Sequence, residues 1–466
     1  MASETFTTIS PTTGQPILTR PSISDADIAL LPAIATQAFN SYKHTPLSQR
    51  QATVKKALQL ISSRQDALAR DITEQVGRPI SYTGKEISTA VARGEYLLKI
   101  SGECLADTAG EAETGFKRFI RKEPIGPVLI LFAWNYPYLI LVNALIPALL
   151  AGNSVIIKPS PQTPTIAEHV KEIFEEAGLP KDVIQFFHCG SPERLERVVR
   201  VPQIKLICFT GSVAGGLMIQ RAAADRVVPV ALELGGKDPA YVREDVDVKW
   251  AAEEIVDGAV FNSGQSCCSI ERVYVAEKIH DKFVEAVSEV LKGYNVGDPF
   301  DPKTNVGPVV SSRSKQVIAD HVHDALRKGG KDMTPFNESF GKQAVGNYVA
   351  PRLLVDVTHD MTVMNEETFG PIIPVMRVGD DDEAVRMMND SEFGLTASIW
   401  TKDVKRGEKL LESIDAGTGF VNRCDYPSPD LAWTGWKNSG KGTTLSKFGF
   451  EQFVKLKSFH IKDYPS

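Results

Sequence analysis

Residues 128–158, VLILFAWNYPYLILVNALIPALLAGNSVIIK, decide the fold class of this chain. Short apolar runs alternate here with turn residues and with one longer apolar run. This pattern predicts a strand over residues 128–132, a turn over 133–137, a buried helix over 138–151 and a strand over 154–158. Strands that alternate with helices indicate a parallel, doubly wound α/β sheet.

The alternation continues along the rest of the chain. Residues 24–104 predict amphipathic helices, most clearly a helix over 49–68, where apolar residues recur at helical spacing. Residues 116–121 and 453–462 alternate apolar and charged side chains, which is typical of strands with one solvent-exposed face. The other predicted elements are helices over 165–177, 248–261 and 281–291, and strands over 183–187, 205–209, 272–275, 348–354 and 372–378.

Composition excludes several classes of protein. A length of 466 residues favours two or three domains. The formal net charge is −6 and no basic run occurs, so we expect no nucleic-acid partner. The six cysteines form no CxxC pair, which favours a reduced, intracellular protein. The eight histidines show no zinc-type clustering, so no metal is expected.

The two ends of the chain carry no recognisable targeting pattern. Residues 1–20 lack the apolar run of a signal peptide and the Arg-rich pattern of a transit peptide. The longest apolar stretch, 138–151, is too short to span a bilayer. Residues 463–466 are not a lipidation or peroxisomal signal. We therefore expect a cytoplasmic protein with no membrane partner.

Two further segments carry reactive groups. Residues 232–237 read LELGGK and place Glu233 on a Gly-rich turn, while residues 261–268 read FNSGQSCC and place Cys267 after a polar turn. A thiol and a carboxylate in such settings predict a nucleophile with an activating base. A buried, inert cysteine and a helix-capping or surface glutamate are the alternatives, and each is commoner for a single residue of its type.

The chain resembles the aldehyde dehydrogenase superfamily over nearly its whole length. The resemblance depends on six motifs that occur in the order of that family. Any one motif is weak, but six in order at family-like separations are specific. They are Ala133-Trp134-Asn135-Tyr136-Pro137, Ile157-Lys158-Pro159-Ser160, Phe209-Thr210-Gly211-Ser212, Glu233-Leu234-Gly235-Gly236-Lys237, Gly264-Gln265-Ser266-Cys267 and Glu366-Glu367-Thr368-Phe369-Gly370-Pro371.

The resemblance implies three catalytic residues and an oxidoreductase that converts an aldehyde to the carboxylic acid. Cys267 would be the nucleophile that forms a thiohemiacetal and then a thioester. Glu233 would be the general base that activates water. The Asn135 amide, with the backbone N–H of Cys267, would stabilise the oxyanion. Lys237 is expected to support its turn rather than take part in the chemistry.

The resemblance also implies a site for NAD or NADP. Lys158 would bind the adenosine ribose, Glu367 the nicotinamide ribose and Ser212 the pyrophosphate at a helix N-terminus. Family members selective for NAD often carry Glu where this chain has Pro161, so the choice of cofactor stays open. The full set of expected cofactor-binding residues is Trp134, Lys158, Gly211, Ser212, Glu367 and Phe369.

The expected substrate pocket is less specific. Arg423 would bind a substrate carboxylate, which would indicate a semialdehyde. The alternative is a structural arginine paired with Asp425. The small-molecule aldehyde itself is not identified. The residues expected to line the pocket are Tyr136, Ile140, Ser266, Cys268, Arg423 and Tyr426.

By resemblance the chain divides into three parts. Residues 1–105 and 125–232 would form a Rossmann-type cofactor domain, on which 434–452 packs back. Residues 233–433 would form an α/β catalytic domain. Residues 106–124 and 453–466 would form oligomerisation strands, because exposed alternating strands invite pairing with another subunit. A homodimer or homotetramer is expected.

Two departures from the family fall near the C-terminus. The usual Pro-Phe-Gly-Gly is replaced by Ala432-Trp433-Thr434-Gly435, and the following Gly-Arg-Glu becomes Gly442-Thr443-Thr444. We expect both to change local packing and to leave catalysis intact.

Two other functions are compatible with the same fold. One is a CoA-acylating aldehyde dehydrogenase, in which CoA replaces water; such members commonly lack the base, so Glu233 argues against it. The other is a non-catalytic binding or structural protein, which predicts loss of Cys267 or Glu233, and both are present. Reduction of cofactor by a panel of aldehydes separates the three.

Overall fold

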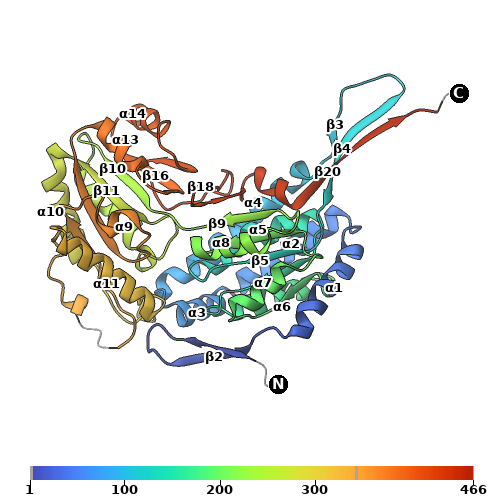
Figure 1. Ribbon diagram of the computed structural model, residues 1–466, viewed down its shortest axis with the longest axis horizontal. Helices are drawn as coiled ribbons and strands as arrows, with labels where there is room; N and C mark the ends of the chain where they lie inside the picture. Colours follow the sequence, from blue (N-terminus) through green and yellow to red (C-terminus); the bar gives the residue numbers. More distant parts are fainter. Residues whose placement is uncertain (1–3, 342–344, 465–466) are drawn as a thin grey trace.

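The computed structural model describes residues 4–341 and 345–464. It consists of two bodies, each built on a largely parallel sheet, and an arm that projects from the first body and carries the C-terminus (Figure 1). The expectations for 1–105 and 453–466 include residues 1–3 and 465–466, which lie outside the described residues.

The first body contains a sheet of order β19-β9-β8-β5-β6-β7. The strands from β9 to β7 run parallel, and β19 joins β9 antiparallel. The doubly wound sheet predicted from residues 128–158 is therefore present. The bounds are β5 (Val128–Leu131), β6 (Val155–Lys158), β7 (Ile184–Phe186), β8 (Leu206–Thr210), β9 (Val230–Glu233) and β19 (Gly440–Lys441).

Helices cover both faces of this sheet, which explains why β5 is apolar throughout. Val128 and Ile130 pack with α2 to α6, whereas Leu129 and Leu131 face the other way, with α1, α7 and α8. Successive side chains of a strand point to opposite faces. The helices are α1 (Asp25–Tyr42), α2 (Leu47–Ser63), α3 (Gln65–Val76), α4 (Ile80–Cys104), α5 (Pro137–Ala151), α6 (Thr165–Glu176), α7 (Pro192–Val199) and α8 (Val213–Ala222).

The second body contains a sheet of order β12-β13-β14-β11-β10-β16-β17, parallel except for the pair β12–β13. Its strands are β10 (Asp238–Val242), β11 (Ile270–Ala276), β12 (Lys331–Asp332), β13 (Arg352–Val355), β14 (Ile372–Val378), β16 (Thr396–Trp400) and β17 (Thr418–Val421). The central strand β11 is buried at every residue because helices again cover both faces.

The helices of the second body divide between these faces. On one face lie α9 (Val248–Val260) and α10 (His280–Lys292). On the other lie α11 (Ser312–Arg327), α12 (Thr362–Asn365), α13 (Asp381–Asn389) and α14 (Val404–Leu411). The short elements are β15 (Phe393–Gly394), β18 (Trp436–Lys437), η1 (Phe261–Gly264), η2 (Glu277–Ile279), η3 (Glu338–Gly341) and η4 (Phe448–Phe453).

The arm consists of β3 (Thr108–Ala109), β4 (Phe116–Pro124) and β20 (Val454–Lys462). β20 pairs antiparallel with β4 along its whole length, and the rings of Phe119 and Phe459 stack at 4.6 Å. The two strands predicted from alternating charge are thus each other's partners. In the order β20-β4-β3, the outer edge of β20 is free within the described chain.

Two features of the N-terminal region differ from the prediction or were not predicted. The prediction of one helix over 49–68 is wrong, because α2 ends at Ser63 and α3 begins at Gln65. Arg64, at the break, has φ −103° and ψ 11° and forms ion pairs with Glu172 and Glu176 of α6. Before α1 lies a hairpin of β1 (Thr5–Ile9) and β2 (Pro16–Pro21), for which the sequence offered no clear signal.

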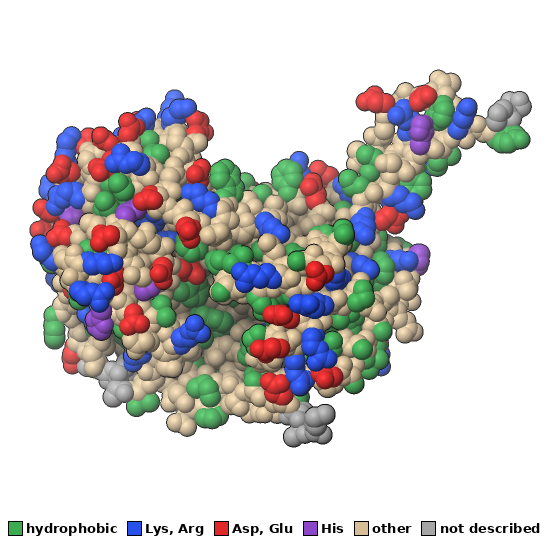
Figure 2. All heavy atoms as spheres, viewed as in Figure 1, with side chains coloured by type: hydrophobic (Ala, Val, Ile, Leu, Met, Phe, Trp, Pro, Cys, Tyr) green, Lys and Arg blue, Asp and Glu red, His purple; other side chains and the backbone are tan. Residues whose placement is uncertain are grey.

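The surface and the helices add two further findings. Within residues 4–341 and 345–464, no helix is long and apolar enough to cross a membrane, and no cluster of His, Cys, Asp and Glu is arranged to hold a metal ion. Acidic and basic side chains are interspersed over the face drawn in Figure 2, so neither sign of charge dominates that face.

Candidate active site

Adjacent parallel strands of the first sheet end in the residues that the sequence singled out. Lys158 ends β6, Thr210 ends β8 and Glu233 ends β9, while Asn135 follows the end of β5. The carboxyl ends of parallel strands meet at one edge of a sheet, where α/β proteins bind their ligands. The fold therefore gathers one set of the predicted site residues along this edge.

A strained turn holds the thiol of Cys267. Within η1 the residues Asn262 (φ 52°), Ser263 (φ 58°) and Gly264 (φ 70°) are left-handed. This conformation is costly for residues with a Cβ atom and persists only where neighbours fix it. Asn262 Oδ1 accepts a hydrogen bond from Arg78 Nε at 3.0 Å, and Ser263 Oγ donates to a backbone carbonyl at 2.9 Å.

The two motifs quoted for the nucleophile and the base meet at Gly236. A Cβ atom at this position would lie 2.5 Å from the Cys267 carbonyl oxygen and 2.7 Å from Asp238 Oδ1. Such distances are too short for any side chain, so the absence of a Cβ lets the turn after Glu233 pack directly against the backbone of Cys267.

Cys267 and Cys268 have different surroundings. Cys267 is half-buried and packs beside Leu395 and Trp433. Cys268 is 3% exposed, and a hydrogen bond with Cys267 together with burial raises its pKa well above the ordinary value. A raised thiol pKa disfavours the thiolate form of Cys268.

Asp425 is a half-buried acidic neighbour of these thiols. Its Oδ1 accepts hydrogen bonds from Ser266 Oγ at 2.9 Å and from Cys268 Sγ at 2.8 Å. Burial raises the pKa of Asp425 to about 6. Asp425 therefore contacts the turn that carries Cys267, and it does not form the pair with Arg423 that was the alternative to substrate binding.

Hydroxyl groups on two sides hold the Glu233 carboxylate. Thr444 Oγ1 donates to Glu233 Oε1, and Thr210 Oγ1 donates to Oε2 at 3.4 Å. Burial raises the pKa of Glu233, while the two hydroxyls and the charge of Arg93 lower it. A carboxylate with a raised pKa in a partly desolvated site suits a general base.

Hydrogen bonds hold both the side chain and the backbone carbonyl of Asn135. Its Nδ2 donates to the Gln265 carbonyl at 3.2 Å, and its backbone carbonyl accepts from Arg78 Nη2. Arg78 is 2% exposed and also pairs with the buried Glu86. An amide nitrogen carries two N–H groups, so one remains for an oxyanion.

Several of the expected cofactor residues are placed as an anionic dinucleotide requires. Ser212 caps α8, with its Oγ accepting from Gly215 N at 3.2 Å, and a Cβ at Gly211 would meet the Phe209 ring at 2.8 Å. Burial lowers the pKa of Lys158 to about 8, and no described carboxylate forms an ion pair with it. A desolvated lysine with free donors fits the hydroxyls of a ribose.

Of the remaining residues expected to bind the cofactor, Trp134 follows β5 in the first body, and Glu367 and Phe369 belong to the second body. Trp134 and Phe369 meet edge to face at 5.7 Å. Glu367 Oε1 accepts from Gly236 N at 3.1 Å, and burial raises the pKa of Glu367 to about 8. Glu367 thus contacts the turn that follows Glu233, which links the cofactor residues to the base.

Lys237 has a structural role, as expected from its turn. Its Nζ lies 2.6 Å from Glu271 Oε2 and donates to Thr368 Oγ1 at 3.0 Å. Glu271 also accepts from the backbone N–H groups of Thr368 and Phe369 at 2.7 and 2.9 Å. This buried network connects the turn after Glu233 to the segment that carries Glu367.

The expected substrate-pocket residues fall into two environments. Tyr136 is half-buried beside Arg78, whose guanidinium lies 4.3 Å from the ring centroid, and Ile140 is half-buried on α5. Arg423 is exposed and lies 3.7 Å above the ring of Tyr426. No described carboxylate pairs with Arg423.

Sequence reasoning missed four residues that contact the site: Arg78, Arg93, Asp425 and Thr444. Only Thr444 carried a signal, because it stands where the family pattern has Glu. The expectation that this departure affects packing alone is incomplete, since Thr444 donates directly to Glu233. The pairing of β19 with β9 and the bridge between Trp433 and Thr444 place it there.

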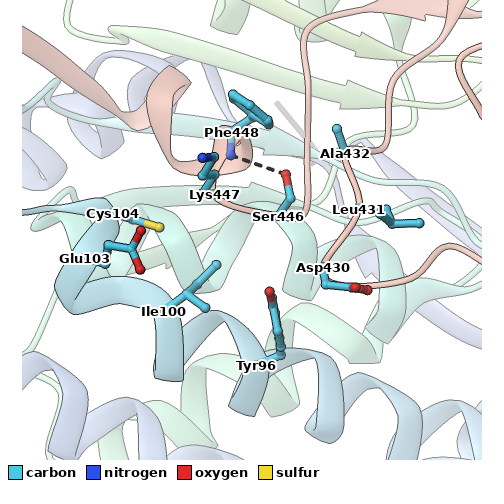
Figure 3. Close-up of a pocket in the computed structure, with 10 residues that line it drawn as sticks. All are labelled: Tyr96, Ile100, Glu103, Cys104, Asp430, Leu431, Ala432, Ser446, Lys447 and Phe448. Atoms are coloured by element: carbon cyan, nitrogen blue, oxygen red, sulfur yellow. Dashed lines mark hydrogen bonds between the residues drawn. The ribbon is translucent and has the colours of Figure 1, made fainter.

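A cavity of about 360 Å³ lies beside this site between α4 and the C-terminal loops (Figure 3). Tyr96 and Ile100 line it from α4, and Asp430 and Phe448 line it from the loops, where Ser446 Oγ accepts from Phe448 N at 3.3 Å. None of the expected catalytic residues lines it. The cavity is therefore separate from the reacting groups.

Comparison with known proteins agrees with this geometry. The model of the aldehyde dehydrogenase family matches residues 1–459. An NADP-dependent succinate-semialdehyde dehydrogenase of Mycobacterium avium is 32% identical over 97% of this chain and 96% of its own length.

Two solved structures share the fold. A 3,6-anhydro-L-galactose dehydrogenase in complex with NADP has a TM-score of 0.92 and 30% identity, and the match covers 98% of this chain and 96% of that one. Betaine aldehyde dehydrogenase from Staphylococcus aureus in complex with NAD⁺ has a TM-score of 0.94 and 27% identity, over 99% and 92%. The chain belongs to the aldehyde dehydrogenase family and is an oxidoreductase that converts an aldehyde to the carboxylic acid with NAD or NADP.

Proposed function

We propose that Cys267 is the nucleophile, Glu233 the general base and Asn135 the oxyanion donor of this reaction. One observation carries the assignment: Gly236 packs the turn after Glu233 against the backbone of Cys267, so the base and the thiol belong to one site. Asn135 is tied to the same turn through the Gln265 carbonyl.

The chemistry of these groups accounts for both halves of the reaction. The Cys267 thiolate adds to the aldehyde carbon, and the oxyanion accepts hydrogen bonds from Asn135 and the Cys267 N–H. A bound NAD(P)⁺ would supply the acceptor for the hydride of this carbon, and loss of that hydride leaves a thioester on Cys267. Glu233 then takes a proton from water, the resulting hydroxide adds to the thioester carbon, and the thiolate departs as the acid forms.

Cofactor binding is assigned to Lys158, Gly211 and Ser212 from the first body and to Trp134, Glu367 and Phe369 around the turn. The support is a half-buried lysine without an ion pair and a capped helix N-terminus at one sheet edge. Pro161 presents no carboxylate toward a 2′-phosphate, so we propose that both NAD and NADP are accepted.

We further propose the division into a cofactor domain, a catalytic domain and oligomerisation strands given by the sequence. The free outer edge of β20 and the exposed Leu456 (69%) and Ile461 (45%) support an assembly through this arm. A homodimer or homotetramer in the cytoplasm is the expected form.

Two variants test the catalytic assignment. Cys267→Ala should reduce kcat to less than about a tenth of wild type, because a loss of 1.4 kcal/mol or more is expected when a nucleophile is removed. Glu233→Gln should slow steady-state turnover and leave a burst of reduced cofactor, because hydride transfer precedes hydrolysis. A Cys267→Ala enzyme of near-normal rate would refute the assignment.

A further inference from the structure

Arg93 lies between the two walls expected to enclose the substrate. It belongs to α4, and its Nη1 donates to Asn143 Oδ1 at 2.9 Å while its Nη2 donates to the Pro427 carbonyl at 3.1 Å. Asn143 lies on α5 one turn after Ile140, and Pro427 directly follows Tyr426. One side chain therefore bridges the pocket residues of α5 and those of the 420–426 segment.

The charge of Arg93 has no anionic partner. The residue is 5% exposed, and its hydrogen-bond acceptors, the Asn143 amide and the carbonyls of Leu139 and Pro427, are all neutral. Its Nε is buried and makes no hydrogen bond. A buried cation is costly unless it is paired and fully hydrogen-bonded. Arg93 is thus an incomplete site for an anion.

Other buried arginines show what a purely structural role looks like here. Arg272, 1% exposed, uses its Nε and both Nη atoms on backbone carbonyls and the Tyr274 hydroxyl. Arg78 is paired with Glu86. Arg50 also has an open Nε, but it is only partly buried and donates to the Ala151 carbonyl at the C-terminal end of α5, where helix carbonyls favour a cation.

The groups with the largest electrostatic influence on Arg93 indicate the site it faces. Burial is the largest influence and lowers its pKa, while the charges of Glu233, Cys268 and Tyr426, in that order, raise it. Arg93 therefore lies within electrostatic reach of the proposed base and of the neighbour of the nucleophile. A substrate group that pairs with Arg93 can belong to a molecule whose aldehyde reaches Cys267.

We propose that Arg93 binds a carboxylate at the far end of the substrate, so that the preferred substrates are short aldehydes with a terminal carboxylate. The inference rests on the proposed function of Cys267 and Glu233. A guanidinium suits this task because its planar fork binds a carboxylate with two hydrogen bonds. The related mycobacterial enzyme is named for succinate semialdehyde, an aldehyde of this class.

Arg423 is the rival for this role. It was the arginine expected from the sequence, but it is exposed and stacks on Tyr426. Water can solvate an exposed guanidinium, so an ion pair there contributes little. The structure favours the buried Arg93 over Arg423 for this reason.

The test compares succinate semialdehyde with butanal, which has the same chain length but no carboxylate. The wild-type enzyme should show a kcat/KM for succinate semialdehyde at least about tenfold higher. Arg93→Met should lower that value by about 10- to 100-fold and change the value for butanal by less than about twofold. The matched control is Arg50→Met, which should keep the wild-type preference.

Product inhibition of the wild-type enzyme gives a second measurement that needs no variant. Succinate should inhibit butanal oxidation at a concentration at least about tenfold lower than butyrate, since only succinate carries the second carboxylate. Equal inhibition, equal kcat/KM for the two aldehydes, or loss of the preference in Arg423→Met but not in Arg93→Met would overturn the assignment. Failure of the wild type to oxidise either aldehyde would instead refute the proposed function.

Discussion

Replacement of Thr444 tests what controls the pKa of Glu233, the proposed base. Its hydroxyl donates to Glu233 Oε1 from a position that is 6% exposed, so bulk water replaces it poorly. Thr444→Val keeps the shape and removes the donor. A hydrogen bond to a charged group contributes about 1.5–3 kcal/mol. At 1.36 kcal/mol per pKa unit, its loss should raise the pKa of Glu233 by about one to two units.

The sign of the effect follows from the role of the base. Glu233 accepts a proton from water only when it is ionised, and a higher pKa makes it protonated at a pH where the wild type is active. The acidic limb of steady-state turnover should therefore move to higher pH by about one to two units. The burst of reduced cofactor should keep its amplitude, because hydride transfer does not need Glu233.

The assay is cofactor reduction across a pH series, with burst and steady-state phases measured separately. Thr444→Ser should restore the wild-type limb, because it restores the hydroxyl. Thr443→Val is the matched control, since Thr443 is the adjacent threonine and its side chain makes no contact with Glu233. The reasoning would be refuted if Thr444→Val left the acidic limb of the pH profile unshifted while Glu233→Gln still slowed steady-state turnover.

Three other predictions follow from single positions. Gly236→Ala should lower kcat more than about tenfold, because the new Cβ would clash with the Cys267 carbonyl. The control Gly102→Ala, in open space on α4, should leave kcat unchanged, and equal rates in both variants would contradict the prediction. Pro161→Glu should lower kcat/KM for NADP by at least about tenfold and leave kcat/KM for NAD unchanged, since a carboxylate repels the 2′-phosphate. Both cofactors are measured at one aldehyde concentration, and an unchanged kcat/KM for NADP would count against Lys158 as the ribose ligand. Leu456→Arg should shift the enzyme to smaller species in light scattering, whereas Val404→Arg on α14, also exposed (54%), should not; an unaltered mass for Leu456→Arg would exclude β20 as the assembly edge.

The fold was largely predictable because its signals are local. The apolar runs 128–132 and 154–158 are short, bounded by turns and separated by a helix, so they specify parallel strands without knowledge of distant contacts. The helix break at Arg64 was not predictable in this way. Residues on both sides continue the helical spacing, and the break coincides with ion pairs to α6 more than a hundred positions away.

The same distinction applies to the site. Cys267, Glu233 and Asn135 lie in motifs of four to six residues, and each motif can be recognised without knowing its partners. Thr444 and Glu233 are 211 positions apart, and Arg93 and Pro427 are 334 apart. No spacing rule connects such residues, because the topology of the sheet and the antiparallel pairing of β19 with β9 bring them together.

The two arginines show why a residue chosen from its sequence neighbours must be compared with its burial in the fold. A guanidinium requires an anionic partner only where it is desolvated. Arg423, which the sequence suggested as the carboxylate ligand, is exposed in the structure. The physical requirement is met by Arg93, which lies on a helix of the other body and is closed in by α5 and the segment after Tyr426. A cation in the substrate pocket is thus a property of the assembled fold, and only a contact between the two bodies creates it.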